Sequence, residues 1–142
     1  KLGVKLVADQ DSLIDVCDIL SFHVPATDQT RNMVNAKFLA QLSPGTIIIN
    51  TSRGDLIDEP ALIEVMDKKD ILVGLDVYRD EPGTAQGEFD SALARHPNVY
   101  GTHHIGASTK QAQIAVAAGV LDVIHAFTSG QIINCVNPSI GQ

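Results

Sequence analysis

Three short segments of the chain each place an ionisable group just after a probable strand. Arg53 follows the apolar run 46–50, and His104 follows the run 98–101. The third group is a carboxylate in the segment 76–82. In open parallel α/β sheets, ligands bind outside the carboxyl ends of the strands. We therefore expect an arginine, a carboxylate and a histidine to converge on one crevice, a set suited to a carboxylate-bearing substrate and a proton transfer.

Each of these groups also has an ordinary structural alternative. A guanidinium can hold a carboxylate through two parallel hydrogen bonds and polarise a neighbouring carbonyl, but Arg53 could equally cap a helix or pair with Asp55. A histidine can accept a hydroxyl proton near neutral pH, but a lone loop histidine such as His104 could merely hydrogen-bond its own loop. Asp80 and Glu81 are adjacent in the third segment, and the residues alone do not choose between them.

Apolar runs alternate with amphipathic stretches, a pattern typical of strands and crossover helices in a parallel α/β sheet. Strands are expected at 4–8, 19–24, 46–50, 71–76 and 98–101. Helices are expected at 12–18, 35–42, 59–69 and 108–128, with a further short helix between residue 90 and the last strand. Ser12, Asp58 and Ser108 are the expected N-caps, because their oxygens can accept from the first free amide hydrogens of a helix.

Composition excludes several functional classes. Hydrophobic residues make up 44% of the 142-residue chain and charged residues 19%, which is typical of a soluble globular domain. The net charge of −7 and the lack of a basic stripe argue against nucleic acid and against an anionic membrane surface. No apolar run is expected to reach the roughly 20 residues of a membrane span.

Cys17 and Cys135 are too few and too far apart for a disulfide framework or a zinc site, and no metal is expected. The start shows no secretory signal, which favours the cytoplasm.

The three segments resemble the D-isomer-specific 2-hydroxyacid dehydrogenases. The run 100–109, YGTHHIGAST, is most similar to the 3-phosphoglycerate dehydrogenases within that family, as is the tail 134–137. The resemblance implies a partial Rossmann-like, doubly wound parallel sheet with flanking helices. Residues 1–130 would form part of an NAD-binding domain, and residues 131–142 would be a tail or linker.

The resemblance assigns catalytic roles to three residues. Arg53 would hold the substrate carboxylate. His104 matches the acid/base histidine of the family's Pro-His-Ile-Gly motif, although His103 stands where the family usually has proline. The family's glutamate directly precedes a proline, so Glu81, before Pro82, is the match that would orient the histidine.

The resemblance also implies a set of cofactor contacts. Asp76 would accept a hydrogen bond from the nicotinamide carboxamide, unless it only caps a turn as an acidic loop residue. The chain has no Gly-x-Gly-x-x-Gly run to hold a pyrophosphate. The acidic residue that selects NAD over NADP is also missing. The cofactor-binding residues implied are Pro25, Thr51, Ser52, Arg53, Asp76, His104, Gly106 and Ala107.

The function implied is NAD-dependent oxidation of 3-phosphoglycerate to 3-phosphohydroxypyruvate, which belongs to serine biosynthesis. The alternatives are another 2-hydroxyacid dehydrogenase, acting on glyoxylate, hydroxypyruvate or D-lactate, or a non-catalytic scaffold that senses a dinucleotide. The parent protein is expected to be a homo-oligomer, a dimer or tetramer, that acts on a small 2-hydroxy acid. The isolated 142-residue chain is expected to be inactive or nearly so, because the pyrophosphate anchor and the substrate domain are absent from it.

Overall fold

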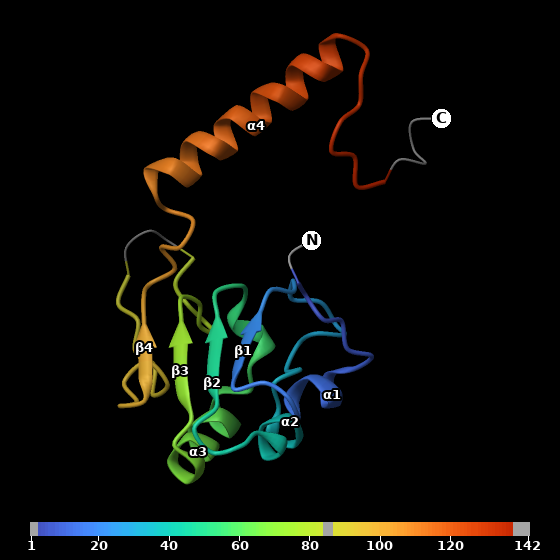
Figure 1. The fold of residues 1–142 in the computed structure, drawn as a ribbon. Helices are drawn as coiled ribbons and strands as arrows, with labels where there is room; N and C mark the ends of the chain where they lie inside the picture. Colours follow the sequence, from blue (N-terminus) through green and yellow to red (C-terminus); the bar gives the residue numbers. More distant parts are fainter. Residues whose placement is uncertain (1–2, 84–86, 138–142) are drawn as a thin grey trace. The chain divides into compact units, whose positions relative to one another are not determined.

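The protein was analysed as a computed structural model that describes residues 3–83 and 87–137 (Figure 1). Contacts divide the chain into two units, Lys1–His104 and Ile105–Gln142. The first unit holds the sheet with its helices, and the second holds one long helix.

Four parallel strands form the sheet of the first unit, in the order β1-β2-β3-β4 (Figure 1). They are β1 (Ile19–Phe22), β2 (Ile47–Asn50), β3 (Leu72–Leu75) and β4 (Val99–Gly101). Three consecutive isoleucines make β2 strongly β-prone, since branched side chains fit a pleated surface. The predicted parallel α/β sheet with flanking helices is confirmed.

The carboxyl ends of all four strands lie on one rung of the sheet. Phe22 pairs with Asn50, Asn50 with Leu75, and Leu75 with Gly101. Every strand therefore releases its following loop at the same level, and those loops carry the predicted site residues.

Three α-helices and a 3₁₀ turn complete the first unit: α1 (Gln10–Ile14), α2 (Ala36–Gln41), η1 (Gly54–Leu56) and α3 (Glu59–Lys69). The Asp58 carboxylate accepts from the Ala61 amide, as predicted for the N-cap of α3. Fully buried Leu39, Ile48 and Leu62 belong to one hydrophobic core that joins helices to sheet.

Four expectations at the element scale were wrong. Residues 4–8 form no strand, and the side chain of Leu6 is 90% exposed. The Asp9 carboxylate accepts from the Ser12 amide, so Asp9, not Ser12, caps a shorter α1. Residues 92–95 form only turns, since the proline that follows His96 disfavours helical backbone before it. Thr109, not Ser108, caps the last helix.

The second unit consists of α4 (Lys110–Thr128) and an irregular segment over residues 129–137. None of the α4 side chains is buried. The predicted apolar side chains of α4 are all exposed: Ile114, Val116, Val120, Val123, Ile124 and Phe127. By length and composition α4 could cross a bilayer, with a mean hydropathy of 1.2, contrary to the sequence expectation. One such helix is weak evidence of a membrane span, because core helices of soluble proteins meet the same criteria.

Candidate functional site

The common rung of the strands defines the position of the candidate site. Pro25, Arg53 and His104 each lie three residues beyond the last residue of β1, β2 and β4. The loop after β3 carries Asp76 and Glu81. The loops that carry the predicted groups thus leave the sheet at one end, and the convergence of the three side chains on one crevice stays a prediction.

The loop after β2 is held by a buried asparagine. The Asn50 side chain has no exposed surface, and its Oδ1 accepts from the Ser52 amide at 3.1 Å and from the Ser52 hydroxyl at 2.9 Å. Its Nδ2 donates to the Arg53 carbonyl oxygen at 2.8 Å. Sequence reasoning missed Asn50 as a positioning residue; the signal was a polar residue ending an otherwise apolar buried strand.

Arg53 extends its side chain into solvent at this edge. Its Nη1 donates to the Ser52 carbonyl oxygen at 2.6 Å. Neither alternative role is present: Asp55 pairs with Arg31 at 2.8 Å, and the Arg53 side chain makes no capping bond to η1. An exposed guanidinium, with five N–H donors in a planar fork, is suited to holding a carboxylate.

Glu81 and His104 come together at the ends of their loops. Glu81 Oε1 lies 2.5 Å from His104 Nδ1, and the Glu81 Oε2 accepts the Tyr78 amide hydrogen at 3.3 Å. An ionised carboxylate can only accept, so Nδ1 carries the hydrogen and Nε2 is left to exchange a proton with a ligand. The adjacent Asp80 is exposed. Of the two candidate carboxylates, the structure brings Glu81 to the histidine.

His104 and the residue that precedes Glu81 both have left-handed backbone. His104 has φ 57°, and Asp80, directly before Glu81, also has φ 57°. Such a conformation costs a non-glycine residue on the order of 1 kcal/mol and persists only when the surrounding contacts hold it. Asn32, Asp70 and Asn134 have the same conformation outside this pair, so the backbone alone does not mark the pair as a working site.

Asp76 lies just beyond β3, with a side chain that is 6% exposed. Its Oδ1 accepts the Thr102 hydroxyl at 2.5 Å, and the Thr102 amide donates to the Leu75 carbonyl oxygen at 2.9 Å. Asp76 thus joins the loops after β3 and β4, and its role toward a nicotinamide stays a prediction. Thr102 was not singled out from the sequence, because a threonine beyond a strand has no distinguishing spacing.

The remaining predicted cofactor residues are exposed or half-buried. Pro25 is exposed, and its carbonyl oxygen accepts the Thr30 hydroxyl at 2.6 Å. Thr51 is exposed at the strand edge, next to the half-buried Ser52. Gly106 and Ala107 lie in the second unit, where both are exposed. Their roles toward a cofactor stay predictions.

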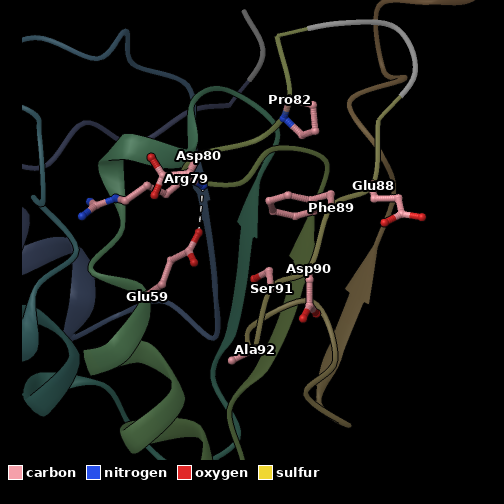
Figure 2. A pocket seen from close by; sticks show the side chains of 9 residues that line it. All are labelled: Glu59, Arg79, Asp80, Pro82, Glu88, Phe89, Asp90, Ser91 and Ala92. Carbon is pink, nitrogen blue, oxygen red and sulfur yellow. Dashed lines mark hydrogen bonds between the residues drawn. The ribbon is translucent and has the colours of Figure 1, made fainter.

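A cavity of about 420 Å³ lies beside the loop that follows β3. Figure 2 shows Glu59, Asp80, Glu88 and Asp90 among the side chains around it, while the Arg79 guanidinium points away from the Phe89 ring. Four carboxylates repel an anion, so this cavity does not suit a dinucleotide or a hydroxy acid. None of the predicted catalytic residues lines it. Within residues 3–83 and 87–137, no three His, Cys, Asp or Glu side chains gather as a metal site would require.

Comparison with known proteins identifies a family for this chain. The sequence profile described as "D-isomer specific 2-hydroxyacid dehydrogenase, NAD binding domain" matches residues 1–106. The chain is 43% identical over 117 residues to the hydroxypyruvate reductase of Thermotoga maritima, covering 82% of this chain and 38% of that protein. It is 35% identical over 127 residues to the D-3-phosphoglycerate dehydrogenase of Escherichia coli strain K12, covering 88% and 31%.

A solved structure with the same fold is that of D-lactate dehydrogenase with NAD+ from Lactobacillus jensenii. The TM-score is 0.75 at 32% identity, and the match covers 89% of this chain and 41% of that one. The chain thus spans less than half the length of the relatives that it matches. A family profile that covers residues 1–106 of 142 shows the family directly. The chain belongs to the D-isomer-specific 2-hydroxyacid dehydrogenases and carries part of their NAD-binding domain.

Proposed function

We propose that the whole protein to which this chain belongs is an NAD-dependent D-2-hydroxyacid dehydrogenase with Arg53, Glu81 and His104 as its catalytic residues. The observation that supports this most is the 2.5 Å contact between Glu81 and His104, at the edge where β2, β3 and β4 end on one rung. A carboxylate against one nitrogen of a histidine fixes the tautomer and orients the ring.

Each proposed catalytic residue has a distinct role in the reaction. Arg53 binds the substrate carboxylate and turns the hydroxyl-bearing carbon toward the cofactor face. His104 Nε2 accepts the hydroxyl proton, and Glu81 stabilises the imidazolium that results. In the direction of reduction, His104 returns that proton to the carbonyl oxygen. Bound NAD would take up the hydride that leaves the same carbon.

The chemistry of the donor set fits the nicotinamide half of NAD. Asp76 carries a carboxylate, an acceptor of the kind that suits the carboxamide of a nicotinamide. The hydroxyls of Thr51 and Ser52 suit a ribose. Pro25, Gly106 and Ala107 complete the proposed contacts. The glycine-rich turn for the pyrophosphate is not in this sequence, so this chain supplies only one end of the cofactor site.

We propose 3-phosphoglycerate as the substrate, which would assign the protein to serine biosynthesis. The run 100–109 and the similarity to the D-3-phosphoglycerate dehydrogenase of Escherichia coli support this choice. A second candidate is hydroxypyruvate, because identity to the Thermotoga maritima reductase reaches 43%. Either substrate needs the same carboxylate clamp and the same proton transfer.

The test is hydride transfer by the whole protein, followed at the absorbance of NADH, with 3-phosphoglycerate and a panel of 2-hydroxy acids. His104→Ala should lower kcat by about 10²- to 10⁴-fold, because a general acid/base contributes that much. Arg53→Ala should lower kcat/KM chiefly through a higher KM, since it removes a charge-assisted contact with the substrate.

His103→Ala is the matched control, because His103 is an exposed neighbour with no proposed role. It should stay within about twofold of wild type. Turnover with hydroxypyruvate but not 3-phosphoglycerate would exchange the substrate and keep the mechanism. No turnover with any acid, with NAD still bound, would favour the non-catalytic scaffold.

We propose further that the whole protein is a homo-oligomer, a dimer or tetramer, in the cytoplasm, and that residues 1–130 belong to its NAD-binding domain with 131–142 as a linker. The small-molecule substrates named for its relatives support the metabolic assignment. Sedimentation of the whole protein measures the oligomeric state directly.

A further inference from the structure

One buried aromatic residue touches the segments that carry all three proposed catalytic groups. Tyr78 lies three residues beyond the end of β3, the strand between β2 and β4. Its side chain is 8% exposed. The ring packs against Phe89, with ring centroids 5.3 Å apart and planes at 53°.

The first contact is with the segment that carries Arg53. The peptide between Tyr78 and Arg79 runs directly over Gly54. A Cβ placed on Gly54 would lie 2.0 Å from the Tyr78 carbonyl carbon and 2.4 Å from the Arg79 nitrogen. These are backbone atoms that cannot swing aside, so only glycine can follow Arg53 at this spacing.

The second contact is with Glu81. The Tyr78 amide hydrogen is donated to Glu81 Oε2 at 3.3 Å, while Oε1 of the same carboxylate lies against His104. The carboxylate is thereby held from both sides.

The third contact is with the strand that leads to His104. A Cβ on Gly101 would lie 1.9 Å from the Tyr78 phenol oxygen and 3.3 Å from the ring carbon Cζ. Gly101 is the last residue of β4, three residues before His104. The phenol therefore packs directly on the backbone at the end of β4, where the loop that carries His104 begins.

We propose that Tyr78 is a positioning residue, a spacer whose backbone and phenol together set the relative places of Arg53, Glu81 and His104. This proposal rests on the proposed function. It predicts that a change at the phenol–Gly101 contact displaces His104 while leaving the Arg53 side of the site in place. Proton transfer should then suffer more than substrate binding.

The test is a cycle of three variants in the whole protein: Gly101→Ala, Tyr78→Phe and both together. Gly101→Ala should lower kcat by about 10- to 100-fold with KM little changed, because a displacement of about 1 Å can cost that much. Tyr78→Phe removes the oxygen that the new methyl would meet and leaves Cζ at 3.3 Å. The double variant should therefore recover kcat to within about threefold of Tyr78→Phe alone.

Gly74→Ala in β3 is the matched control, because the nearest atom to a Cβ there is Ile49 Cγ1 at 3.9 Å. It should leave both kcat and KM unchanged. A kcat for Gly101→Ala close to wild type, or a folded double variant without recovery, would overturn the proposal.

Two further measurements keep the result decisive. If Gly101→Ala does not fold, Tyr78→Leu takes its place, because leucine does not reach Gly101. The kcat of Tyr78→Leu should fall about tenfold below that of Tyr78→Phe at similar KM. Equal kcat values for these two variants would contradict the spacer role. If no acid is turned over, the NMR chemical shifts of the His104 ring replace kcat. These shifts should change in Gly101→Ala and return to their values in Tyr78→Phe in the double variant. Because this readout needs no turnover, it distinguishes failure of the spacer role from failure of the dehydrogenase assignment.

Discussion

At the scale of single residues, the candidate site depends on side chains that hold loops as much as on those that would do chemistry. Asn50 ties down the loop of Arg53 with three hydrogen bonds, and Thr102 joins its loop to Asp76. The Tyr78 phenol packs against the backbone of Gly101 at the end of β4. The proposed acid/base pair is thus held by neighbours that have no reacting atoms.

Tyr78 also links stability to pH. Burial raises the pKa of its phenol above the ordinary value of 10.0, and the negative charges of Asp76 and Glu59 add to the effect. Above that ordinary value the unfolded chain ionises while the folded chain keeps its proton. The stability that Tyr78 contributes is therefore complete below about pH 10 and is lost as the pH rises toward the folded pKa.

Urea unfolding measured at about pH 9 and about pH 11 checks this prediction. The free energy of unfolding should fall less over this interval in Tyr78→Phe than in wild type. Tyr100→Phe is the control, because its side chain is 74% exposed. Equal slopes for wild type and Tyr78→Phe would show that the phenol ionises as freely in the folded state as in the unfolded one.

Sequence reasoning found the residues with a chemical signature and missed those that act by contact. Arg53 and His104 stand out because each follows an apolar strand, but each also had an ordinary structural alternative, so their proposed roles needed the family resemblance. Gly101 and Tyr78 could not be predicted, since their close approach arises only when β3 and β4 pair. The choice of Glu81 over Asp80 needed the family resemblance or the structure, because the two carboxylates share the same local pattern.

At the scale of elements, one lysine joins two helices at the end of the sheet opposite to the site. Lys69, the last residue of α3, donates from Nζ to the carbonyl oxygens of Ala40 at 2.7 Å and Leu42 at 2.8 Å. These carbonyls belong to the last turn and C-cap of α2, where cations are favoured by the helix dipole. Lys69 also places its charge in the last turn of its own helix, α3.

Lys69→Met should destabilise the 142-residue chain by about 1 to 2 kcal/mol, because charge-assisted bonds to otherwise unpaired helix carbonyls are lost. Lys68→Met is the matched control. Lys68 pairs only with Glu64, both side chains are about two-thirds exposed, and such pairs contribute less than about 1 kcal/mol. Urea unfolding followed by circular dichroism compares the two, and equal losses would argue against the cap.

Element boundaries were predicted well where a buried partner exists and poorly where none does. The strands 46–50, 71–76 and 98–101 shortened by only a few residues, because each pairs with a neighbour. Residues 4–8 have the apolar composition of a strand, but none of them is buried and all except Val7 are exposed. Strand propensity alone does not form a strand without a partner to complete its hydrogen bonds.

At the scale of the whole molecule, burial is distributed unevenly between the two units. Among the described residues, the buried hydrophobic side chains belong to the first unit, and no α4 side chain is buried. Most of the stability of a helix in a protein comes from packing of its apolar face. The two units therefore differ in how much buried surface each of them contains by itself.

Hydrogen exchange followed by mass spectrometry should reveal this difference. Amides of β2, β3 and α3 should exchange slowly, at rates near those of global unfolding, whereas α4 amides should exchange through local opening and much faster. The comparison needs no variant, because β2 serves as the internal reference. Slow exchange in α4, at rates close to those of β2, would contradict the prediction.

The common rung of the strand ends has a consequence for protein engineering. All proposed catalytic residues leave the sheet at one end, while the turns at 43–46, 69–71 and 96–98 lie at the other. The proposed catalytic residues and the turns at the opposite end of the sheet therefore lie in separate stretches of the sequence. Libraries aimed at thermal tolerance can be confined to the second set of turns, and libraries aimed at substrate range to the first, with little interference between the two searches.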